Sequence, residues 1–308
     1  MDTNPNMGSV ENTSGNAMSP GATPHDSATP SSKPIAGLTV EEQNDHNKIQ
    51  ITLRDSEVPI VVLFGPPACG KTMTLVRLSR YLRDVLNYTV QPDNKFRPDD
   101  DVNYQKMCSE FNDMLSSDQA AKSTSNMSFM LVRVLDKHGN LLVQLLEAPG
   151  ELYYNPNDKR EPNVDFPRPV RVIRSSKHRK IWCHMLEPNW EFHSQAGKYV
   201  DKIKKLHSSP KAGDSNIFIF NKVDESNFVI STGVVNSKAM IREIDGIYPN
   251  IFVPFTTHGI FGTSFNFQVV PFQTGEYCHA ADGTKSFDPG PDEYPALLWK
   301  VIYKLIRG

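Results

Sequence analysis

Apolar runs along the chain predict strands, and a helical repeat follows the clearest of them. From Val58 to Phe64 the residues are apolar on both faces, which is typical of a strand inside a parallel sheet covered by helices. From Met73 to Leu86 leucines and valines recur at helical spacing, with arginine and aspartate between them. These two segments predict a strand, a glycine-rich turn and an amphipathic helix.

Further strands and helices alternate over the rest of the chain. The turn over 136–140 contains Gly139 and Asn140, which suit a tight hairpin between the two flanking apolar runs. We expect strands over 48–53, 127–135, 141–147, 180–186, 216–220 and 250–255, and helices over 104–115, 194–206 and 294–306. The alternation predicts an α/β fold of three layers, a mostly parallel sheet flanked by helices with one antiparallel edge hairpin.

The first part of the chain has a different composition. Ser, Thr, Pro, Gly and Asn dominate from Met1 to Pro34, where no residue is aromatic and Val10 is the only large aliphatic residue. Such a segment buries too little surface to offset its ordering entropy. We interpret 1–46 as a disordered tail and 47–308 as a single domain, with an insertion at about 91–122 and an extension at about 259–290.

Charge and cysteine usage narrow the classes of function. The formal net charge is −2 over 308 residues, and a general nucleic-acid binder usually has a clear positive excess, so no nucleic-acid partner is expected. The four cysteines have neither metal-ligand nor disulfide-framework spacing, which favours a reducing compartment. No apolar run approaches the roughly 20 residues of a membrane helix, so we expect a cytoplasmic protein without a membrane span.

The turn between the first strand and the first long helix matches the phosphate-loop (P-loop) pattern GxxxxGK[ST]. Glycines allow successive backbone N–H groups to turn inward around a phosphate, and the helix N-terminus adds a favourable dipole. We expect Lys71 to reach the β- and γ-phosphates and the Thr72 hydroxyl to be a Mg²⁺ ligand. The predicted phosphate-binding set is Gly65, Pro66, Pro67, Ala68, Cys69, Gly70, Lys71, Thr72 and Met73.

Two other interpretations of this loop stay open. A glycine turn between a strand and a helix can be purely structural. Cys69 within the loop invites a redox function, although a small residue there is more often space-filling.

A second motif addresses the identity of the base. Asn221, Lys222, Val223 and Asp224 form an NKxD sequence directly after the apolar strand 216–220, where a base-recognition turn belongs. With this motif the chain resembles the Ras-like and translation-factor-related P-loop GTPases, over the ordered motifs from Gly65 to about Thr257. The insertion, the EAPG sequence at 147–150 and the extension before the last helix look more like a divergent bacterial type than the small signalling members.

The resemblance implies roles for the NKxD residues and for the cofactors. In the family the aspartate accepts two hydrogen bonds from guanine and the lysine packs on the ring, which corresponds to Asp224 and Lys222, and the cofactors would be GTP or GDP with Mg²⁺. Adenine has no donor at that edge and would leave the Asp224 carboxylate unpaired, at a cost of several kcal/mol by order of magnitude. NKVD as an ordinary polar turn is the alternative.

The resemblance also implies metal and hydrolysis elements. Glu147 and Gly150 stand where the family has an Asp-x-x-Gly segment, whose acid supports Mg²⁺ and whose glycine N–H senses the γ-phosphate. Glu147 is longer by one methylene, and a simple helix N-cap or strand-end carboxylate is the alternative. Glu151 takes the place of a water-orienting glutamine, and its charge would oppose the γ-phosphate, so efficient intrinsic hydrolysis is not assured.

Two further elements are placed by position alone. Thr124, with Ser123 and Ser125 as alternatives, precedes the hairpin and is our choice for the first-switch residue that reaches Mg²⁺. Thr256 and Thr257 follow the predicted strand 250–255, where the family has its second base-contacting loop, and would give backbone N–H groups to the guanine oxygen.

Three functions compete at this stage. The first is a GTP-dependent switch that hydrolyses GTP slowly and works with a protein effector or regulator. The second is a guanine-nucleotide-binding scaffold without hydrolysis, motivated by Glu147 and Glu151. The third is a P-loop ATPase or kinase in which NKVD is incidental. The basic stretch from Arg168 to Arg179 is interpreted as a solvated helix face rather than a source of a catalytic arginine.

Overall fold

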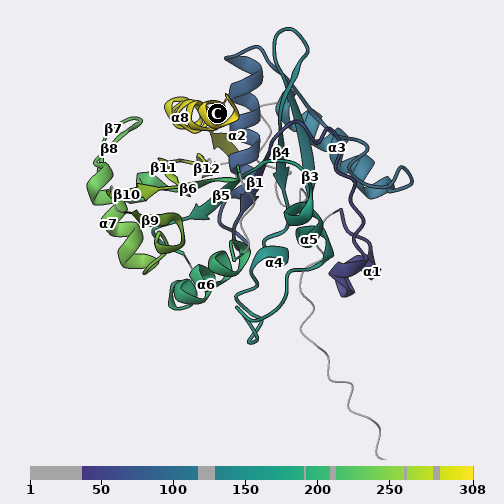
Figure 1. Ribbon diagram of the computed structural model, residues 1–308. Coiled ribbons are helices and arrows are strands. Elements are labelled where there is room, and N and C mark those ends of the chain that lie inside the picture. Colours follow the sequence, from purple (N-terminus) through teal and green to yellow (C-terminus); the bar gives the residue numbers. More distant parts are fainter. Residues whose placement is uncertain are drawn as a thin grey trace, which may run out of the picture. The chain divides into compact units, whose positions relative to one another are not determined.

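The centre of the protein is a seven-stranded sheet with the strand order β11-β6-β5-β1-β4-β3-β2 (Figure 1). The computed structural model describes residues 37–116, 129–190, 192–208, 213–259, 262–279 and 285–307. The strands are β1 Ile60–Phe64, β2 Thr89–Pro92, β3 Met130–Leu135, β4 Leu141–Glu147, β5 Lys180–Leu186, β6 Ser215–Phe220 and β11 Gln268–Pro271. Strands β4, β1, β5, β6 and β11 run parallel, and β3 pairs antiparallel with both β4 and β2.

Strand β1 lies in the interior of this sheet. All of its residues are buried, and Val62 pairs with Leu146 of β4 on one side and Trp182 of β5 on the other. A strand with parallel neighbours on both sides and helices on both faces has no polar face, which is why its sequence is apolar throughout. The burial predicted from the sequence is confirmed.

Helices cover both faces of the sheet. Figure 1 shows α2 and α8 together over one face and α4, α5 and α6 over the other. The helices are α2 Lys71–Asp84, α3 Val102–Ser116, α4 Gly150–Tyr153, α5 Arg168–Ser175, α6 Ala196–Leu206, α7 Ser237–Ile247 and α8 Glu293–Arg307. The three-layer architecture, with the predicted hairpin formed by β3 and β4, is that of a P-loop NTPase α/β fold.

The described part of the chain begins earlier than the predicted domain. Helix α1 (Val40–Asn44) and the 3₁₀ helix η1 (His46–Lys48) precede the sheet, although the predicted disordered tail extends to residue 46. A capping box starts α1, because Thr39 Oγ1 accepts from the Glu42 N–H at 3.2 Å and the Glu42 carboxylate accepts from the Thr39 N–H at 3.0 Å. The Glu42 carboxylate also pairs with the buried Arg97 guanidinium at 2.6 Å, and this distant contact orders a segment whose composition alone favours disorder.

Two predicted strands are wrong. Residues 48–53 join no sheet in the structure, and β2 takes the edge position beside β3 instead. Residues 250–255 form a turn and the 3₁₀ helix η6 (Val253–Phe255). Pro254 lies inside this segment and lacks the N–H that a sheet ladder needs, so a paired strand is disfavoured there.

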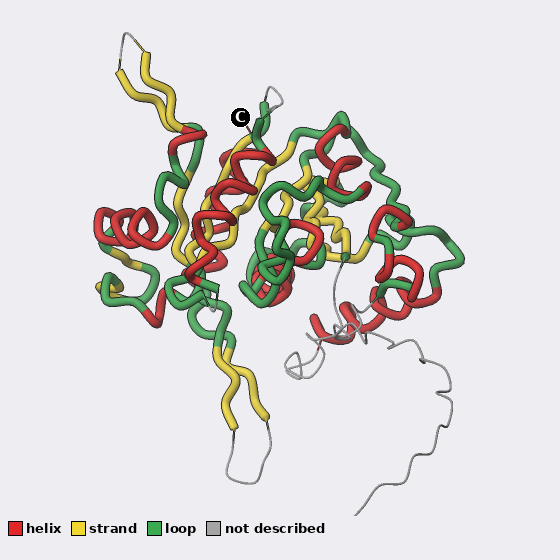
Figure 2. The backbone as a smooth tube through the Cα atoms, turned by 90° about the horizontal axis from the view of Figure 1, so that it is seen from below, coloured by secondary structure: helices red, strands yellow, loops and turns green. Residues whose placement is uncertain are grey.

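Other elements were not predicted. They include helix α7, strand β11 and three two-stranded hairpins, β7–β8 (Val229–Ser231, Val234–Val235), β9–β10 (Thr256–Gly259, Gly262–Phe265) and β12–β13 (Glu276–His279, Lys285–Asp288). Figure 2 shows β9–β10 and β12–β13 extending away from the central sheet in opposite directions. The last of these hairpins lies between β11 and α8 in sequence, within the extension predicted at about 259–290.

Candidate functional site

The P-loop connects the carboxyl end of β1 to the first turn of α2. Its backbone turns through two left-handed residues, Ala68 at φ 61° and Gly70 at φ 85°. The left-handed conformation is unfavourable for a residue with a Cβ, so Ala68 is held in a strained backbone position, as residues at binding sites often are. Glycine is required at position 65, since a Cβ there would lie 2.6 Å from the Cys69 sulfur and 2.8 Å from the Met185 Cβ.

The lysine of the loop is buried and oriented by the loop itself. Lys71 is 5% exposed, and its ammonium donates to the Pro66 carbonyl at 2.8 Å. Its Nζ atom therefore lies over the loop rather than in solvent. This places a positive charge against the concave run of backbone, where the predicted phosphates would lie.

Two of the three predicted metal ligands, Thr72 and Glu147, meet in the structure. The Thr72 hydroxyl donates to Glu147 Oε1 at 3.1 Å, joining the start of α2 to the end of β4. Glu147 is 2% exposed, and burial raises the pKa of its carboxyl to about 7, against the opposing effects of Lys71 and Thr72. Within the described residues, Glu147 Oε2 is buried without a hydrogen-bond partner. A buried carboxylate oxygen with no partner fits a divalent cation or one of its bound waters.

Gly150 lies directly against the P-loop. A Cβ at this position would be 2.2 Å from the Pro67 nitrogen and 2.3 Å from the Pro66 carbonyl carbon, so any side chain would push α4 away. Only glycine allows this close approach of two backbone segments. The structure thus brings the predicted γ-phosphate sensor to the loop that would hold the phosphates.

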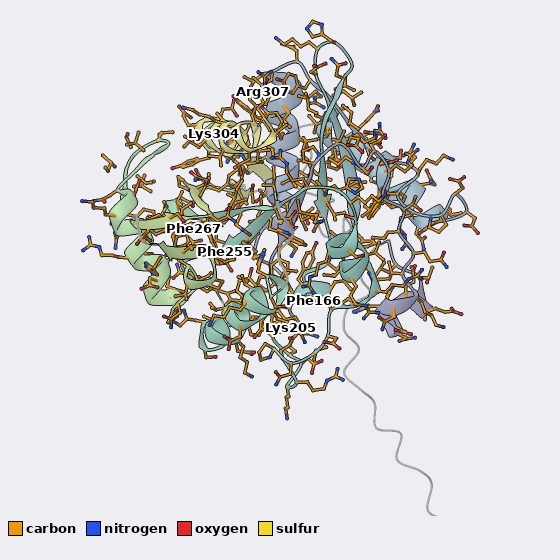
Figure 3. All side chains as sticks on the ribbon, in the orientation of Figure 1. Phe166, Lys205, Phe255, Phe267, Lys304 and Arg307 are labelled. Atoms are coloured by element: carbon orange, nitrogen blue, oxygen red, sulfur yellow. The ribbon has the colours of Figure 1, made fainter. Side chains whose placement is uncertain are left out.

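Glu151 extends toward a different part of the molecule. It lines a cavity of about 470 Å³ between η1, the segment before α5 and α6, together with His46 and Phe166. Lys205 on α6 holds the segment before α5 by donating to the Val164 carbonyl at 3.1 Å, and Figure 3 shows Phe166 and Lys205 at this junction. Burial lowers the pKa of the His46 imidazole, and the Glu151 carboxylate opposes that effect.

The NKVD motif is joined to the P-loop by a direct hydrogen bond. Asn221 follows β6, is fully buried, and its side-chain amide donates to the Cys69 carbonyl at 3.2 Å. Lys222 adopts a left-handed conformation at φ 54° and pairs with the buried Glu187 carboxylate at 2.7 Å. Asp224 is exposed, and its carboxylate makes no hydrogen bond or ion pair with any described residue.

The structure does not bring Thr256 and Thr257 to this edge of the sheet. They belong to β9, which pairs with β10 outside the central sheet. The preceding residue, Phe255, packs on Phe218 in β6 with ring centroids 5.3 Å apart, and its carbonyl accepts from Asn266, which comes before β11 begins. The Asn216 side chain at the start of β6 also donates to the Asn266 carbonyl at 3.3 Å, so this segment lies where β6 and β11 start; Figure 3 shows Phe255 and Phe267 near each other.

A segment missed by the sequence analysis lies beside NKVD instead. It is the loop of residues 272–275 after β11, here called the β11 loop. The Val223 N–H donates to the Phe272 carbonyl at 3.2 Å. A Cβ on Gly70 would meet the Asn221 amide at 2.4 Å and the Thr274 methyl at 3.1 Å, so this loop also contacts the P-loop. Its sequence signal is the short run QVVPF, two valines followed by proline, within a stretch interpreted as an extension.

The other residues predicted for the site are Thr124 with its two alternatives, Met73 and Cys69. Thr124, Ser123 and Ser125 lie outside the described residues. Met73 is half-buried on the first turn of α2. Cys69 is 1% exposed, and burial raises the pKa of its thiol to about 11, so the thiol is protonated at neutral pH and its redox interpretation gains no support.

Comparisons with known proteins give similarity in structure only. No family model matches the chain, and no curated protein matches its sequence. Among solved structures, the putative nucleolar GTP-binding protein 1 of Plasmodium falciparum matches at 12% identity and a TM-score of 0.35, over 84% of this chain and 90% of that one.

Two other matches are longer proteins. The GTPase-like domain of S. cerevisiae Ski7, bound to GTP, matches at 13% identity and a TM-score of 0.43, over 88% of this chain and 52% of that one. Roco2 of Methanosarcina barkeri, bound to GDP, matches at 12% identity and a TM-score of 0.30, over 83% and 52%. The chain thus spans about half the length of these two, and its function is argued below from the site itself. No helix among the described residues is long and apolar enough to cross a membrane.

Proposed function

We propose that the protein binds a guanine nucleotide with Mg²⁺ and acts as a GTP-dependent switch with slow GTPase activity. The observation that carries this proposal is the hydrogen bond from the Asn221 side chain to the Cys69 carbonyl at 3.2 Å. It fixes the NKVD turn to the loop that would hold the phosphates. Strand β5 lies between the two motifs in the sheet, so one ligand that spans β5 can contact both.

The base side of the proposed site favours guanine. The exposed Asp224 carboxylate has no competing partner among the described residues and is available for the two donors on the guanine edge. The Lys222 ammonium is held by the buried Glu187 at 2.7 Å, which leaves its aliphatic stem to cover a ring. The β11 loop, rather than Thr256 and Thr257, is proposed to face the guanine oxygen.

The metal side of the proposed site fits Mg²⁺. Thr72 and Glu147 would hold the ion or its waters. The Thr72 hydroxyl lies 3.1 Å from Glu147 Oε1, and the other carboxylate oxygen, Oε2, has no partner among the described residues. A bound ion supplies charge neutralisation for the β- and γ-phosphates. Burial raises the pKa of the Glu147 carboxyl to about 7, and the positive charge of a bound cation would favour its ionised form.

The proposed reaction is phosphoryl transfer to water. Water attacks the γ-phosphorus, the bond to the β–γ bridging oxygen breaks, and Lys71 stabilises the charge that develops on the phosphates. Gly150 is proposed to sense the γ-phosphate through its N–H; Thr124, outside the described residues, stays the sequence-based prediction for the first-switch residue that reaches Mg²⁺. Glu151 cannot donate a hydrogen bond as a neutral amide would, and it lines the cavity beside His46, so turnover is expected to be slow.

The position of Glu151 also favours the second candidate, a GTP-binding scaffold that does not hydrolyse the nucleotide. We propose a protein effector or regulator as the partner of the protein, whether it is a slow GTPase or a scaffold. The divergent bacterial type inferred from the sequence stays a prediction.

The proposal is tested by measuring the nucleotide affinity and the GTP turnover of the 308-residue chain. We expect fluorescent GTP and GDP to bind with Mg²⁺ and to be displaced by unlabelled GTP far more readily than by ATP. Phosphate release measured at saturating GTP separates a slow GTPase from a scaffold. Tighter binding of ATP than of GTP would overturn the guanine assignment and select the ATPase or kinase alternative.

A further inference from the structure

A buried arginine on α2 ties the P-loop helix to the loop after β11. Arg77 is 3% exposed, and its two terminal nitrogens donate to backbone carbonyls far away in sequence. Nη1 donates to the Gln273 carbonyl, and Nη2 donates to the Pro291 carbonyl at 2.6 Å. The guanidinium also lies over the Phe272 ring, 5.8 Å from its centroid.

These two contacts attach both ends of the segment that contains the β12–β13 hairpin to α2. Gln273 belongs to the β11 loop, and Pro291 follows the β12–β13 hairpin just before α8 begins at Glu293. The carbonyls of Gln273 and Pro291 both accept from the Arg77 guanidinium, so the chain before the hairpin and the chain after it contact the same residue of α2. The β11 loop is thereby kept beside Gly70 and Asn221.

We propose that Arg77 is a positioning residue for nucleotide recognition, which holds the β11 loop against the P-loop so that this loop can contact the six-position of the base. The inference rests on the proposed guanine-nucleotide function. Arg77 is proposed to act through this loop and not by touching the nucleotide, because both of its terminal nitrogens donate to backbone carbonyls.

The chemistry of the contact suits arginine and not lysine. A planar guanidinium can donate in two fixed directions at once, whereas an ammonium is a compact point charge on a flexible stem. Burial lowers the pKa of Arg77 to about 10, with Asp292 and Asp288 opposing that effect, so the side chain is still charged at neutral pH. A charged donor to a buried carbonyl is stronger than a neutral one.

Three nucleotides test the inference on the whole 308-residue chain. GTP, 6-thio-GTP and ITP differ at single positions of the base, since 6-thio-GTP replaces the six-oxygen by sulfur and ITP lacks only the two-amino group. Sulfur accepts hydrogen bonds weakly, so a well-placed β11 loop should favour GTP over 6-thio-GTP. In Arg77→Met we expect that preference to fall by about tenfold, while the preference for GTP over ITP changes by less than about twofold.

The matched control is Arg80→Met on the same helix. Arg80 also donates to a backbone carbonyl, that of Met114 in α3, at 2.7 Å, and it does not hold the β11 loop. Arg80→Met should leave the GTP to 6-thio-GTP ratio within about twofold of wild type. Arg77→Lys should lie between wild type and Arg77→Met, and it serves if the methionine variant does not fold.

A second readout needs no nucleotide. Amide hydrogen exchange at residues 273–275 should speed up in Arg77→Lys and Arg77→Met but not in Arg80→Met, because the loop opens more often when its clamp is lost. Unchanged exchange there, an unchanged GTP to 6-thio-GTP ratio in the Arg77 variants, or an equal change in Arg80→Met would overturn the inference. Failure of the wild type to prefer GTP over ATP would instead reject the proposed function.

Discussion

The phosphate side and the base side of the candidate site differ in how they are built. On the phosphate side, the P-loop, Thr72, Glu147 and Gly150 meet as their motifs predict. On the base side, the NKVD turn lies where it is predicted, but its neighbour is the β11 loop and not the segment at Thr256 and Thr257. One half follows from local sequence, and the other depends on which distant strand pairs with β6.

The difference teaches where sequence reasoning is strong. A P-loop is a contiguous stretch that binds phosphate through its own backbone N–H groups and one lysine ammonium, so the spacing of its residues carries the geometry. A base pocket is assembled from the ends of separate strands, and its composition depends on the order of strands in the sheet. The Asn221 to Cys69 hydrogen bond is the point where the two halves meet.

The largest expected effect is on the phosphate side. Lys71→Ala removes the buried ammonium proposed to bind the phosphates, and we expect GTP affinity to fall by about 100-fold or more. Equilibrium titration with fluorescent GTP measures the change. Lys198→Ala, which removes an exposed lysine on α6, is the control and should bind as wild type does. Retained affinity in Lys71→Ala would mean that the loop does not hold the phosphates.

A smaller effect is expected where the two halves join. Asn221→Ala removes the hydrogen bond that fixes the NKVD turn to the Cys69 carbonyl, and it should weaken GTP binding by about tenfold. Asn189→Ala is the control, because its side-chain amide bonds the Glu225 carboxylate on the exposed surface at 2.9 Å. Equal affinities for the two variants would show that the junction does not matter for binding.

A pair of buried histidines packs on Phe255 rather than beside the NKVD turn, and it should make the fold sensitive to acid. His184 on β5 bonds the Asn216 side chain on β6, and the His207 and His184 Nε2 atoms are 3.2 Å apart. Burial lowers the pKa of His184 from 6.5 to about 4, and burial with the charges of His184 and Arg174 lowers that of His207 to about 2.

The sign of the pH effect follows from proton uptake. Between pH 6.5 and about 4 the unfolded chain binds protons that the folded histidines do not, so stability is full above pH 6.5 and falls as the pH drops. We expect a loss of roughly 1–2 kcal/mol per histidine at about pH 5. Urea unfolding across this range measures it, and His207→Phe should flatten the dependence. A pH dependence as steep in His207→Phe as in wild type would contradict this explanation.

The smallest effect is expected at the residues first predicted to face the base. Replacing both Thr256 and Thr257 by alanine should change GTP affinity by less than about twofold, because β9 lies away from the carboxyl end of β6. The same titration as for Lys71→Ala applies. A loss of about tenfold or more would restore the original assignment and remove the β11 loop from the proposed site.

Much of the fold could be predicted because its central elements have strong local patterns. Strand β1 is apolar throughout, α2 has a clear amphipathic repeat, and the β3–β4 turn contains Gly139 at φ 81°. What could not be predicted depends on partners distant in sequence. Helix α1 is held by Arg97, 55 residues beyond Glu42, and β11 is a four-residue strand whose short QVVP run is a weak signal without its pairing to β6.

The candidate site follows the same rule. Thr72 and Glu147 were identified from short motifs, whereas Arg77, whose contacts are 196 and 214 residues away, has no motif of its own. Its helical position looks like any arginine on an amphipathic face. Only the folded chain shows that it is buried and bound to the β11 loop.

The most direct test of the central claim, that Asp224 reads a guanine base held by the P-loop, is the affinity of Asp224→Asn for GTP and for xanthosine triphosphate. An amide in place of the carboxylate offers a donor to the carbonyl at C2 of xanthine, so the variant should lose affinity for GTP and bind XTP more tightly than GTP, by about tenfold or more. The wild-type protein should show the reverse order. An unchanged preference for GTP in Asp224→Asn would show that position 224 does not read the base, and only a phosphate-binding loop would remain.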